Sequence, residues 1–379
     1  MTQTRYSNGK IVLADKIVEG SVFVENRVIR DIQPERRETP ASAIDLDGDY
    51  LIPGAVDLHT DNLERHVAPR SNAKWPSRSA MAYHDAHCAS AGITTILDSL
   101  GVGDSVYEQD RSEILDAGIQ DLASLGKAGL LKVEHYLHLR CELPSPNLVE
   151  VLDRALRFDG VRLVSLMDHS PGVGQFADPE QYKIRQRRRG LNEAEIAERT
   201  KIALEQQEQM LEPNRAALLE RVAGRNIVLA SHDDRTEEEV LENADLGITI
   251  SEFPVTMAAA LAAKRQQMAV VTGAPNLVRG GSHTGNVAAA DLIRTGAADA
   301  LASDYVPGSM IEGAFKCAAD NTASLPAAIA MISAAPAQMA GFADRGAIEI
   351  GRRADLVRVR LHEGLPVVVQ VWSGGKQVA

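Results

Sequence analysis

The chain has 379 residues, hydrophobic residues make up 45% of it, and its formal net charge at pH 7 is −12. This length suits an α/β barrel with a minor second domain, and the apolar content is sufficient for a sizeable core. The acidic balance argues against a nucleic-acid or anionic-membrane partner, because both require broad basic surfaces, but it leaves room for a phosphorylated small substrate in a local basic pocket.

Both ends of the chain carry short β-type runs that differ in texture from the middle. The runs cover residues 11–13, 20–24, 28–32, 354–359 and 366–372. They are rich in Val and Ile, as strands are, and are separated by turn-forming residues. We therefore expect one small β-sandwich domain that is built from residues 1–53 and 346–379.

The middle of the chain alternates strand-type and helix-type segments. Eight strands are predicted, at residues 55–60, 94–99, 136–142, 161–168, 226–231, 247–251, 268–272 and 300–303. Eight strands separated by helices predict a (β/α)8 TIM barrel over residues 54–345, with its active site at the C-terminal ends of the strands. An open doubly wound sheet is disfavoured, because no Gly-rich dinucleotide motif follows the first strand.

One connection, at about residues 175–225, is unusually long and polar. Connections of this length are typical of lids or interfaces. It contains a basic run from Lys183 to Arg189, which could reach over a polyphosphate. The favoured interpretation of this run is a solvated helix face, because most charge runs are solvated.

Histidines and acidic residues recur where the predicted strands end. The first strand ends with His59 and Asp61, which share a face with Asp57 because strand side chains alternate. Later strand ends add His138, Arg140, Glu142, His169, His232, Glu252 and Asp304. A lone histidine after a strand is usually a cap or a satisfied core residue, but several at one rim favour metal ligation. An ion pair between Arg140 and Glu142 remains an alternative for the third strand end.

A glycine-containing loop follows the seventh strand, with the sequence Arg-Gly-Gly-Ser-His-Thr-Gly-Asn at residues 279–286. Glycines let backbone amides approach an oxyanion, and the Arg, Ser and His side chains add donors. Barrels often bind phosphate in the loops after strands seven and eight. The position of this loop therefore indicates a phosphate site, although Gly-rich turns alone are common.

Together these motifs resemble the amidohydrolase superfamily. The segment Leu-Ile-Pro-Gly-Ala-Val-Asp-Leu-His at residues 51–59 and the segment from Gly346 to Val357 are typical of it. A closer resemblance is to the PhnM family of α-D-ribose 1-methylphosphonate 5-triphosphate diphosphatases, which belong to the carbon–phosphorus lyase pathway of phosphonate metabolism. The motifs that carry it cover residues 57–64, 138–142, 167–172, 231–234, 281–286 and 303–307.

The resemblance implies a metal-dependent hydrolase that releases pyrophosphate from a ribosyl phosphonate triphosphate. One or two divalent ions, with zinc preferred to manganese or iron, would be held by His59, Asp61, Glu142, His169, His232 and Asp304. The ions would lower the pKa of a water that attacks the α-phosphorus, and Asp304 would accept its proton. Arg140 and His283 would neutralise the charge that develops on the phosphoryl oxygens. Substrate binding would involve Arg140, Lys183, Arg279, Gly281, Ser282 and His283.

The resemblance leaves the completion of the metal site open. His-x-Asp at residues 59–61 replaces the His-x-His of the wider superfamily, a substitution that the PhnM family shares. The ligand bridging two ions would be Glu142 or a carboxylated Lys132, and Glu142 is favoured because it lies at a strand end. For the assembly, a homodimer is the default expectation.

Two other functions stay open. One is an amidohydrolase or deaminase acting on a cyclic amide or nucleobase, although a neutral nucleobase would not need the basic loop at 279–286. The other is a metal-free scaffold, which the density of costly strand-end polar groups disfavours. The three cysteines form neither a zinc motif nor a disulfide framework, and the N-terminus lacks the apolar core of a signal peptide. We therefore expect a cytoplasmic enzyme with no membrane partner.

Overall fold

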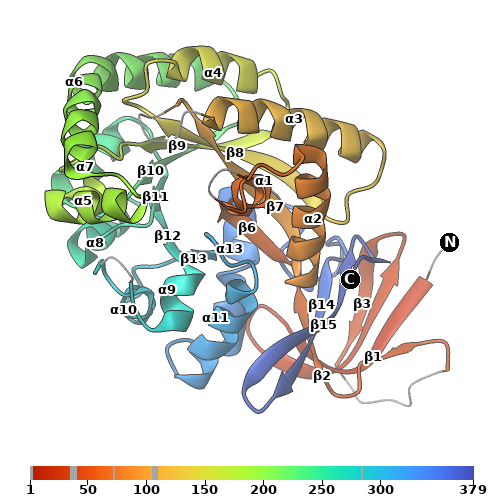
Figure 1. Cartoon of the computed structure of the whole chain (residues 1–379). Helices are drawn as coiled ribbons and strands as arrows, with labels where there is room; N and C mark the ends of the chain where they lie inside the picture. Colours follow the sequence, from red (N-terminus) through yellow and green to blue (C-terminus); the bar gives the residue numbers. More distant parts are fainter. Residues whose placement is uncertain (1–2, 35–40, 71–72, 105–109, 283–284) are drawn as a thin grey trace.

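The computed structural model describes residues 3–34, 41–70, 73–104, 110–282 and 285–379. They form two eight-stranded sheets, one in a barrel and one in a β domain that holds both ends of the chain (Figure 1). Within these ranges, no helix is both long enough and apolar enough to cross a bilayer.

The β domain joins the two ends of the chain in one sheet. Its strands are β1 (Gln3–Val12), β2 (Ile17–Glu25), β3 (Val28–Gln33), β4 (Ile44–Asp45), β5 (Tyr50–Pro53), β14 (Leu356–His362), β15 (Leu365–Ser373) and β16 (Lys376–Gln377). Their order is β16-β15-β14-β5-β1-β2-β3, with β4 beside β1. Side chains from the two ends share a core, in which the rings of Tyr6 and Trp372 have centroids 4.8 Å apart.

The barrel strands are parallel and follow one another in chain order. They are β6 (Ala55–Thr60), β7 (Ile93–Val102), β8 (Glu134–Glu142), β9 (Val161–Met167), β10 (Val228–His232), β11 (Ile250–Glu252), β12 (Ala269–Gly273) and β13 (Ala300–Ala302). A bridge between Thr60 and Asp304 brings the first strand to the last. The fully buried Asp57 supports this closure, since its carboxylate accepts the N–H groups of His59 (3.3 Å) and Ser303 (3.1 Å). The predicted TIM barrel with a small β domain from both termini is confirmed.

Helices surround the barrel. They are α1 (Asn62–Val67), α2 (Ser77–Ser90), α3 (Arg111–Lys127), α4 (Leu148–Ala155), α7 (Glu237–Asp245), α8 (Met257–Arg265), α9 (Ala274–Arg279), α10 (Ala289–Arg294), α11 (Ser309–Ala319), α12 (Leu325–Ala330) and α13 (Ala334–Met339). Side chains alternate along β8: Leu137 and Leu139 pack in the core that the helices share, whereas the ring of His138 lies against that of His59. Polar residues of β8 are thereby directed into the barrel.

The long connection after β9 forms η1 (Gly174–Phe176), α5 (Pro179–Arg188) and α6 (Glu193–Val222). Each helix has its own start signal: the Asp178 side chain accepts the Glu180 N–H at 2.9 Å, and Asn192 opens α6 with a capping box. Arg187 links the two helices through Glu193, with Nε and Oε1 2.6 Å apart. In Figure 1 both helices lie on the side of the barrel away from the β domain.

A buried ionic network connects α2, β7 and β8. The two oxygens of Asp98 lie 2.7 Å from His84 Nε2 and 2.8 Å from His135 Nδ1, and His135 Nε2 lies 3.2 Å from Asp85. Burial opposes the charged form of His135, but Asp98 and Asp85 outweigh it and raise the pKa of His135 to about 9. His135 is therefore an imidazolium that two carboxylates hold inside the fold.

This network predicts that the stability of the chain falls as the pH rises. A histidine whose pKa is raised on folding contributes its full stabilisation below its unfolded pKa, about 6.5, and loses it as the pH passes the folded value. The folded pKa of about 9 for His135 corresponds to about 3 kcal/mol. Melting temperatures between about pH 6 and pH 10 should decline less steeply for His135→Gln than for the wild type. Equal slopes would contradict the assignment.

Candidate active site

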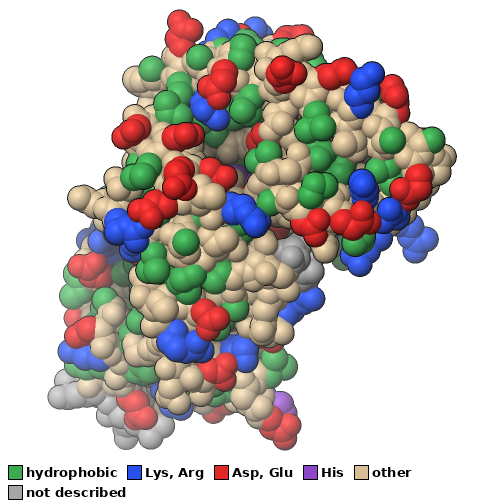
Figure 2. All heavy atoms as spheres, turned by 90° about the vertical axis from the view of Figure 1, so that its left-hand side faces the viewer, with side chains coloured by type: hydrophobic (Ala, Val, Ile, Leu, Met, Phe, Trp, Pro, Cys, Tyr) green, Lys and Arg blue, Asp and Glu red, His purple; other side chains and the backbone are tan. Residues whose placement is uncertain are grey.

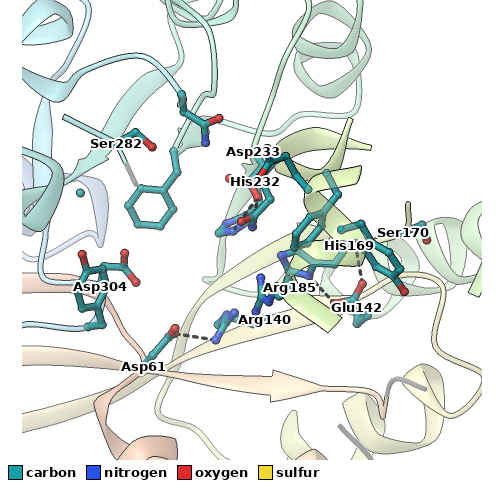
Figure 3. A pocket seen from close by; sticks show the side chains of 18 of the residues that line it. Asp61, Arg140, Glu142, His169, Ser170, Arg185, His232, Asp233, Ser282 and Asp304 are labelled. Atoms are coloured by element: carbon teal, nitrogen blue, oxygen red, sulfur yellow. Dashed lines mark hydrogen bonds and ion pairs between the residues drawn. The ribbon is translucent and has the colours of Figure 1, made fainter. Parts of the chain in front are cut away.

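A cavity of about 730 Å³ opens at the C-terminal ends of the barrel strands, where TIM barrels carry their active sites (Figure 3). Strand ends, α5 and α6 contribute to its wall. Figure 2 looks onto the side that carries these helices and shows a hollow with a histidine inside it. The predicted site residues that line the cavity are His59, Asp61, Arg140, Glu142, His169, His232, Arg279, Ser282 and Asp304.

One group of potential metal ligands forms where β6 meets the chain after β13. His59, Asp61 and Asp304 each offer an atom, and these atoms lie within 4.8 Å of one another. The backbone fixes the arrangement through two hydrogen bonds. The N–H of Asp304 donates to the carbonyl oxygen of His59 (2.9 Å), and the carbonyl oxygen of Asp304 accepts the N–H of Asp61 (2.8 Å). Burial, followed by the neighbouring Asp61 carboxylate, raises the pKa of Asp304 to about 6. A bound cation would relieve this crowding of negative charge.

A second group follows β9 and β10. His169, His232 and Asp233 also offer atoms that lie within 4.8 Å of one another. The prediction from sequence included both histidines but not Asp233, whose Oδ2 accepts a hydrogen bond from Gln175 Nε2 at 2.8 Å. The next residue, Asp234, turns away to Ser231 and Ser251. Of the two adjacent aspartates, only the first therefore belongs to the cavity.

Sharp turns at the strand ends direct these side chains. Asp233, Phe253 and Asp304 have left-handed backbones, with φ of 58°, 54° and 52°. Aspartate tolerates this conformation, whereas a non-Gly residue such as phenylalanine adopts it at a cost of roughly 1–3 kcal/mol. The Phe253 ring lies against the rings of His59 and His232, with centroids 5.0 and 5.5 Å away. The strain thus keeps an apolar ring beside the two potential ligands.

Two glutamates anchor the histidines through one ring nitrogen. Glu252 accepts from His59 Nδ1 (2.8 Å) and from His232 Nδ1 (2.9 Å), and Glu142 accepts from His169 Nδ1 (2.7 Å). Burial would raise the pKa of Glu252, but the surrounding histidines hold it well below its usual range. Each Nδ1 is therefore engaged by a carboxylate, which leaves Nε2 as the free coordinating atom.

This donor set fits divalent metal ions. Metal-binding histidines usually give their second nitrogen to a carboxylate, as all three do here. His59 Nε2 lies 3.4 Å from Asp61 Oδ1, and His232 Nε2 lies 3.7 Å from Asp233 Oδ2. Nitrogen and carboxylate ligands therefore face each other in both groups. Mixed His and carboxylate sites accept zinc, manganese and iron alike.

The two predicted bridging ligands, Glu142 and Lys132, belong to neither group. Glu142 lies behind His169, where it also accepts the His169 N–H (2.9 Å) and contacts Arg111 Nη1 (3.3 Å). Lys132 donates to the backbone oxygen of Val378 at 2.8 Å, near the C-terminal end of the chain. These contacts of Glu142 fix the orientation of the His169 ring.

The alternative of an ion pair between Arg140 and Glu142 is wrong, because each residue pairs with other partners. Arg140 Nη1 lies 2.6 Å from Asp61 and 3.9 Å from Glu64, while Glu142 pairs with Arg111. In Figure 3 the Arg140 guanidinium stands between Asp61 and the His169 group. Two arginines are thus held by carboxylates next to the potential metal ligands.

The other predicted binding residues divide into three cases. Arg279 and Ser282 line the cavity, and Arg279 Nη1 lies 3.4 Å from the Tyr305 hydroxyl. Gly281 is not part of the cavity wall, and His283 lies outside the described residues. Lys183 is also absent from the wall and lies 3.8 Å from Glu180. Its neighbours on α5 line the cavity instead, so the basic run is not simply a solvated face.

Sequence comparison identifies two levels of relationship. Residues 188–379 match the model described as the amidohydrolase family. The chain is also 41% identical over 375 residues to the α-D-ribose 1-methylphosphonate 5-triphosphate diphosphatase of Escherichia coli K12. That alignment covers 98% of this chain and 99% of the E. coli enzyme.

Solved structures with the same fold are much more distant in sequence. The N-acetyl-D-glucosamine-6-phosphate deacetylase of Mycobacterium smegmatis superimposes with a TM-score of 0.64 at 16% identity and covers 100% of both chains. The dihydropyrimidinase of Brevibacillus agri gives a TM-score of 0.62 at 14% identity, over 99% of this chain and 95% of its own. At such identities the likeness supports the fold alone.

Proposed function

Because this chain belongs to the amidohydrolase family, and within it to the PhnM family of α-D-ribose 1-methylphosphonate 5-triphosphate diphosphatases, we propose that it hydrolyses that triphosphate to release pyrophosphate in phosphonate degradation. The observation that carries the proposal is the 41% identity over 98% of the chain. The cavity supports it independently, since seven arginines and no lysines are among the described residues that line its wall, in a chain of net charge −12. An anionic substrate accounts for this local reversal of charge.

The residues proposed to hold one or two divalent ions are His59, Asp61, His169, His232, Asp233 and Asp304. Zinc is the expected metal, with manganese and iron as the other candidates. Bound there, the metal would polarise a phosphoryl oxygen and lower the pKa of water. This set replaces the predicted Glu142 with Asp233, because Glu142 is engaged with His169 and Arg111.

The reaction is a single displacement at the α-phosphorus. The oxygen of water forms the new bond to this phosphorus, and the bond to the oxygen that bridges to the β-phosphate breaks. Pyrophosphate leaves, and the α-phosphate remains on the ribose 5-position with the 1-methylphosphonate untouched. Asp304 accepts the proton of the attacking water, because its carboxylate lies within 4.8 Å of the potential ligand atoms of His59 and Asp61.

Arginines at the strand ends stabilise the charge that develops during this step. Arg140 and Arg111 are each fixed by a carboxylate, Asp61 and Glu142. Guanidinium groups that are held in place before the reaction stabilise phosphoryl oxygens without further reorganisation. Arg140 is therefore proposed as a catalytic residue, with Arg279 and Ser282 binding the substrate from the opposite loop.

Amide hydrolysis or deamination of a neutral ring is the second candidate, and it leaves the arginine-rich wall without a purpose. A product assay separates the two. Metal-loaded protein should release pyrophosphate from the ribosyl phosphonate triphosphate, and less orthophosphate than pyrophosphate. ATP, run in parallel, tests whether the ribosyl phosphonate is required. If metal is bound and neither triphosphate releases pyrophosphate or orthophosphate, the proposal is wrong.

A further inference from the structure

One face of α5 is turned toward the cavity. Gln181, Arg185 and Arg188 follow one another at helical spacing, and all three line the wall, together with Arg189 at the end of the helix. Arg187 points elsewhere and pairs with Glu180 and Glu193, each at 2.6 Å. The basic run thus separates into residues that face the cavity and residues that hold the helix in place.

We propose that this face of α5 is the binding site for the terminal diphosphate of the substrate, the part that leaves as pyrophosphate. The inference rests on the proposed function, since it assigns residues to the β- and γ-phosphates of the same triphosphate. The site consists of Arg185, Arg188 and Arg189, and we refer to it below as the α5 arginine face.

The α5 arginine face begins next to the potential metal ligands. The Arg185 guanidinium carbon lies 5.2 Å from the centroid of the Phe176 ring, and that ring lies 6.3 Å from the ring of His169. Phe176 is buried and offers its ring face to the arginine. In Figure 3 Arg185 stands beside His169 and Arg140. A phosphate chain that has its α-phosphorus at the metal ligands can therefore continue onto α5.

Charge decides which end of the substrate fits α5. A terminal diphosphate carries about three negative charges near neutral pH, whereas a phosphonate ester carries about one. Three adjacent arginines match the diphosphate, and Arg279 with Ser282 suffices for the phosphonate end. Arginine also suits this role better than lysine, because its planar fork donates two parallel hydrogen bonds to one phosphate.

The partners of the other arginines in the cavity support the same assignment. Arg140 and Arg111 are engaged with the carboxylates of Asp61 and Glu142. Arg65 lies over the Tyr305 ring, 5.2 Å from its centroid. Arg188, by contrast, has no ion pair with any residue in the described ranges, although it lines the cavity. A guanidinium that lines a cavity without a carboxylate partner is suited to an anionic ligand.

The test measures the binding of inorganic pyrophosphate to metal-loaded protein by calorimetry, with metal also present in the buffer. Arg185→Ala and Arg188→Ala should each weaken binding about 10- to 100-fold, the loss expected for a charge-assisted hydrogen bond. Lys183→Ala is the matched control, because it removes the same charge from the same helix without touching the cavity, and it should bind within about twofold of the wild type. Arg188→Lys should recover part of the affinity.

Steady-state kinetics separate this inference from the proposed function. The two alanine variants should raise the KM for the triphosphate by more than they lower kcat, while inhibition by methylphosphonate stays unchanged. If the wild type turns over the substrate but both variants keep wild-type pyrophosphate affinity and KM, the α5 site is wrong and the function stands. If pyrophosphate binding depends on these arginines but no triphosphate is hydrolysed, the site stands and the function is wrong.

Discussion

Replacing Glu252 with Gln should lower kcat/KM by about 10²–10³ and reduce the amount of bound metal. Each carboxylate that orients a metal-binding histidine contributes about 10- to 100-fold, and Glu252 orients two, His59 and His232. A glutamine can accept a hydrogen bond only through its oxygen. Its amide nitrogen therefore faces one Nδ1 as a donor and forces that histidine to carry its proton on Nε2, where it cannot ligate a metal.

The measurement is metal per chain by atomic emission after gel filtration, together with kcat/KM. Asp98→Asn is the matched control, because Asp98 is an equally buried carboxylate between two histidines, His84 and His135, but lies outside the cavity. It should lower the melting temperature and leave the metal content unchanged. Full metal occupancy and activity in Glu252→Gln would show that Glu252 does not position the ligands.

The sequence was sufficient to predict the fold because each element carries its own signal. The eight apolar runs between residues 55 and 303 all became barrel strands. The β-type runs at the two ends met in one sheet, through the pairing of β5 with β14.

The site could be predicted only as a set of residues, without their partners. Glu252 contacts His59 across 193 positions of the chain, a distance that no local pattern reveals. Its position at a strand end marked it as a candidate ligand, but only the fold shows that it lies behind two histidines. Glu142 was expected to bridge two metal ions for the same local reason, and it binds His169 and Arg111 instead.

The α5 arginines illustrate a different limit. The sequence shows a basic run from residue 183 to 189, and a helical wheel divides it into faces only when the bounds of the helix are known. Lys183 was the predicted contact, yet Arg185 and Arg188 line the cavity. Which face meets the barrel depends on how η1 and α6 hold α5, and that information lies in tertiary packing.

Replacing Asp304 with Asn should lower kcat by about 10²–10⁴, the range for loss of a general base. Asparagine keeps an oxygen near His59 and Asp61 but cannot accept a proton at neutral pH, so the chemical step suffers more than the metal site.

His232→Ala provides the contrast, because it removes a nitrogen ligand and should lose metal and activity together. Asp320→Asn, at an exposed pair with Lys316, controls for the change of charge. An Asp304→Asn variant with near wild-type kcat and bound metal would move the proton acceptor to another group, and Asp233 is the first to test, since it stands beside His232 and His169 in the second ligand group.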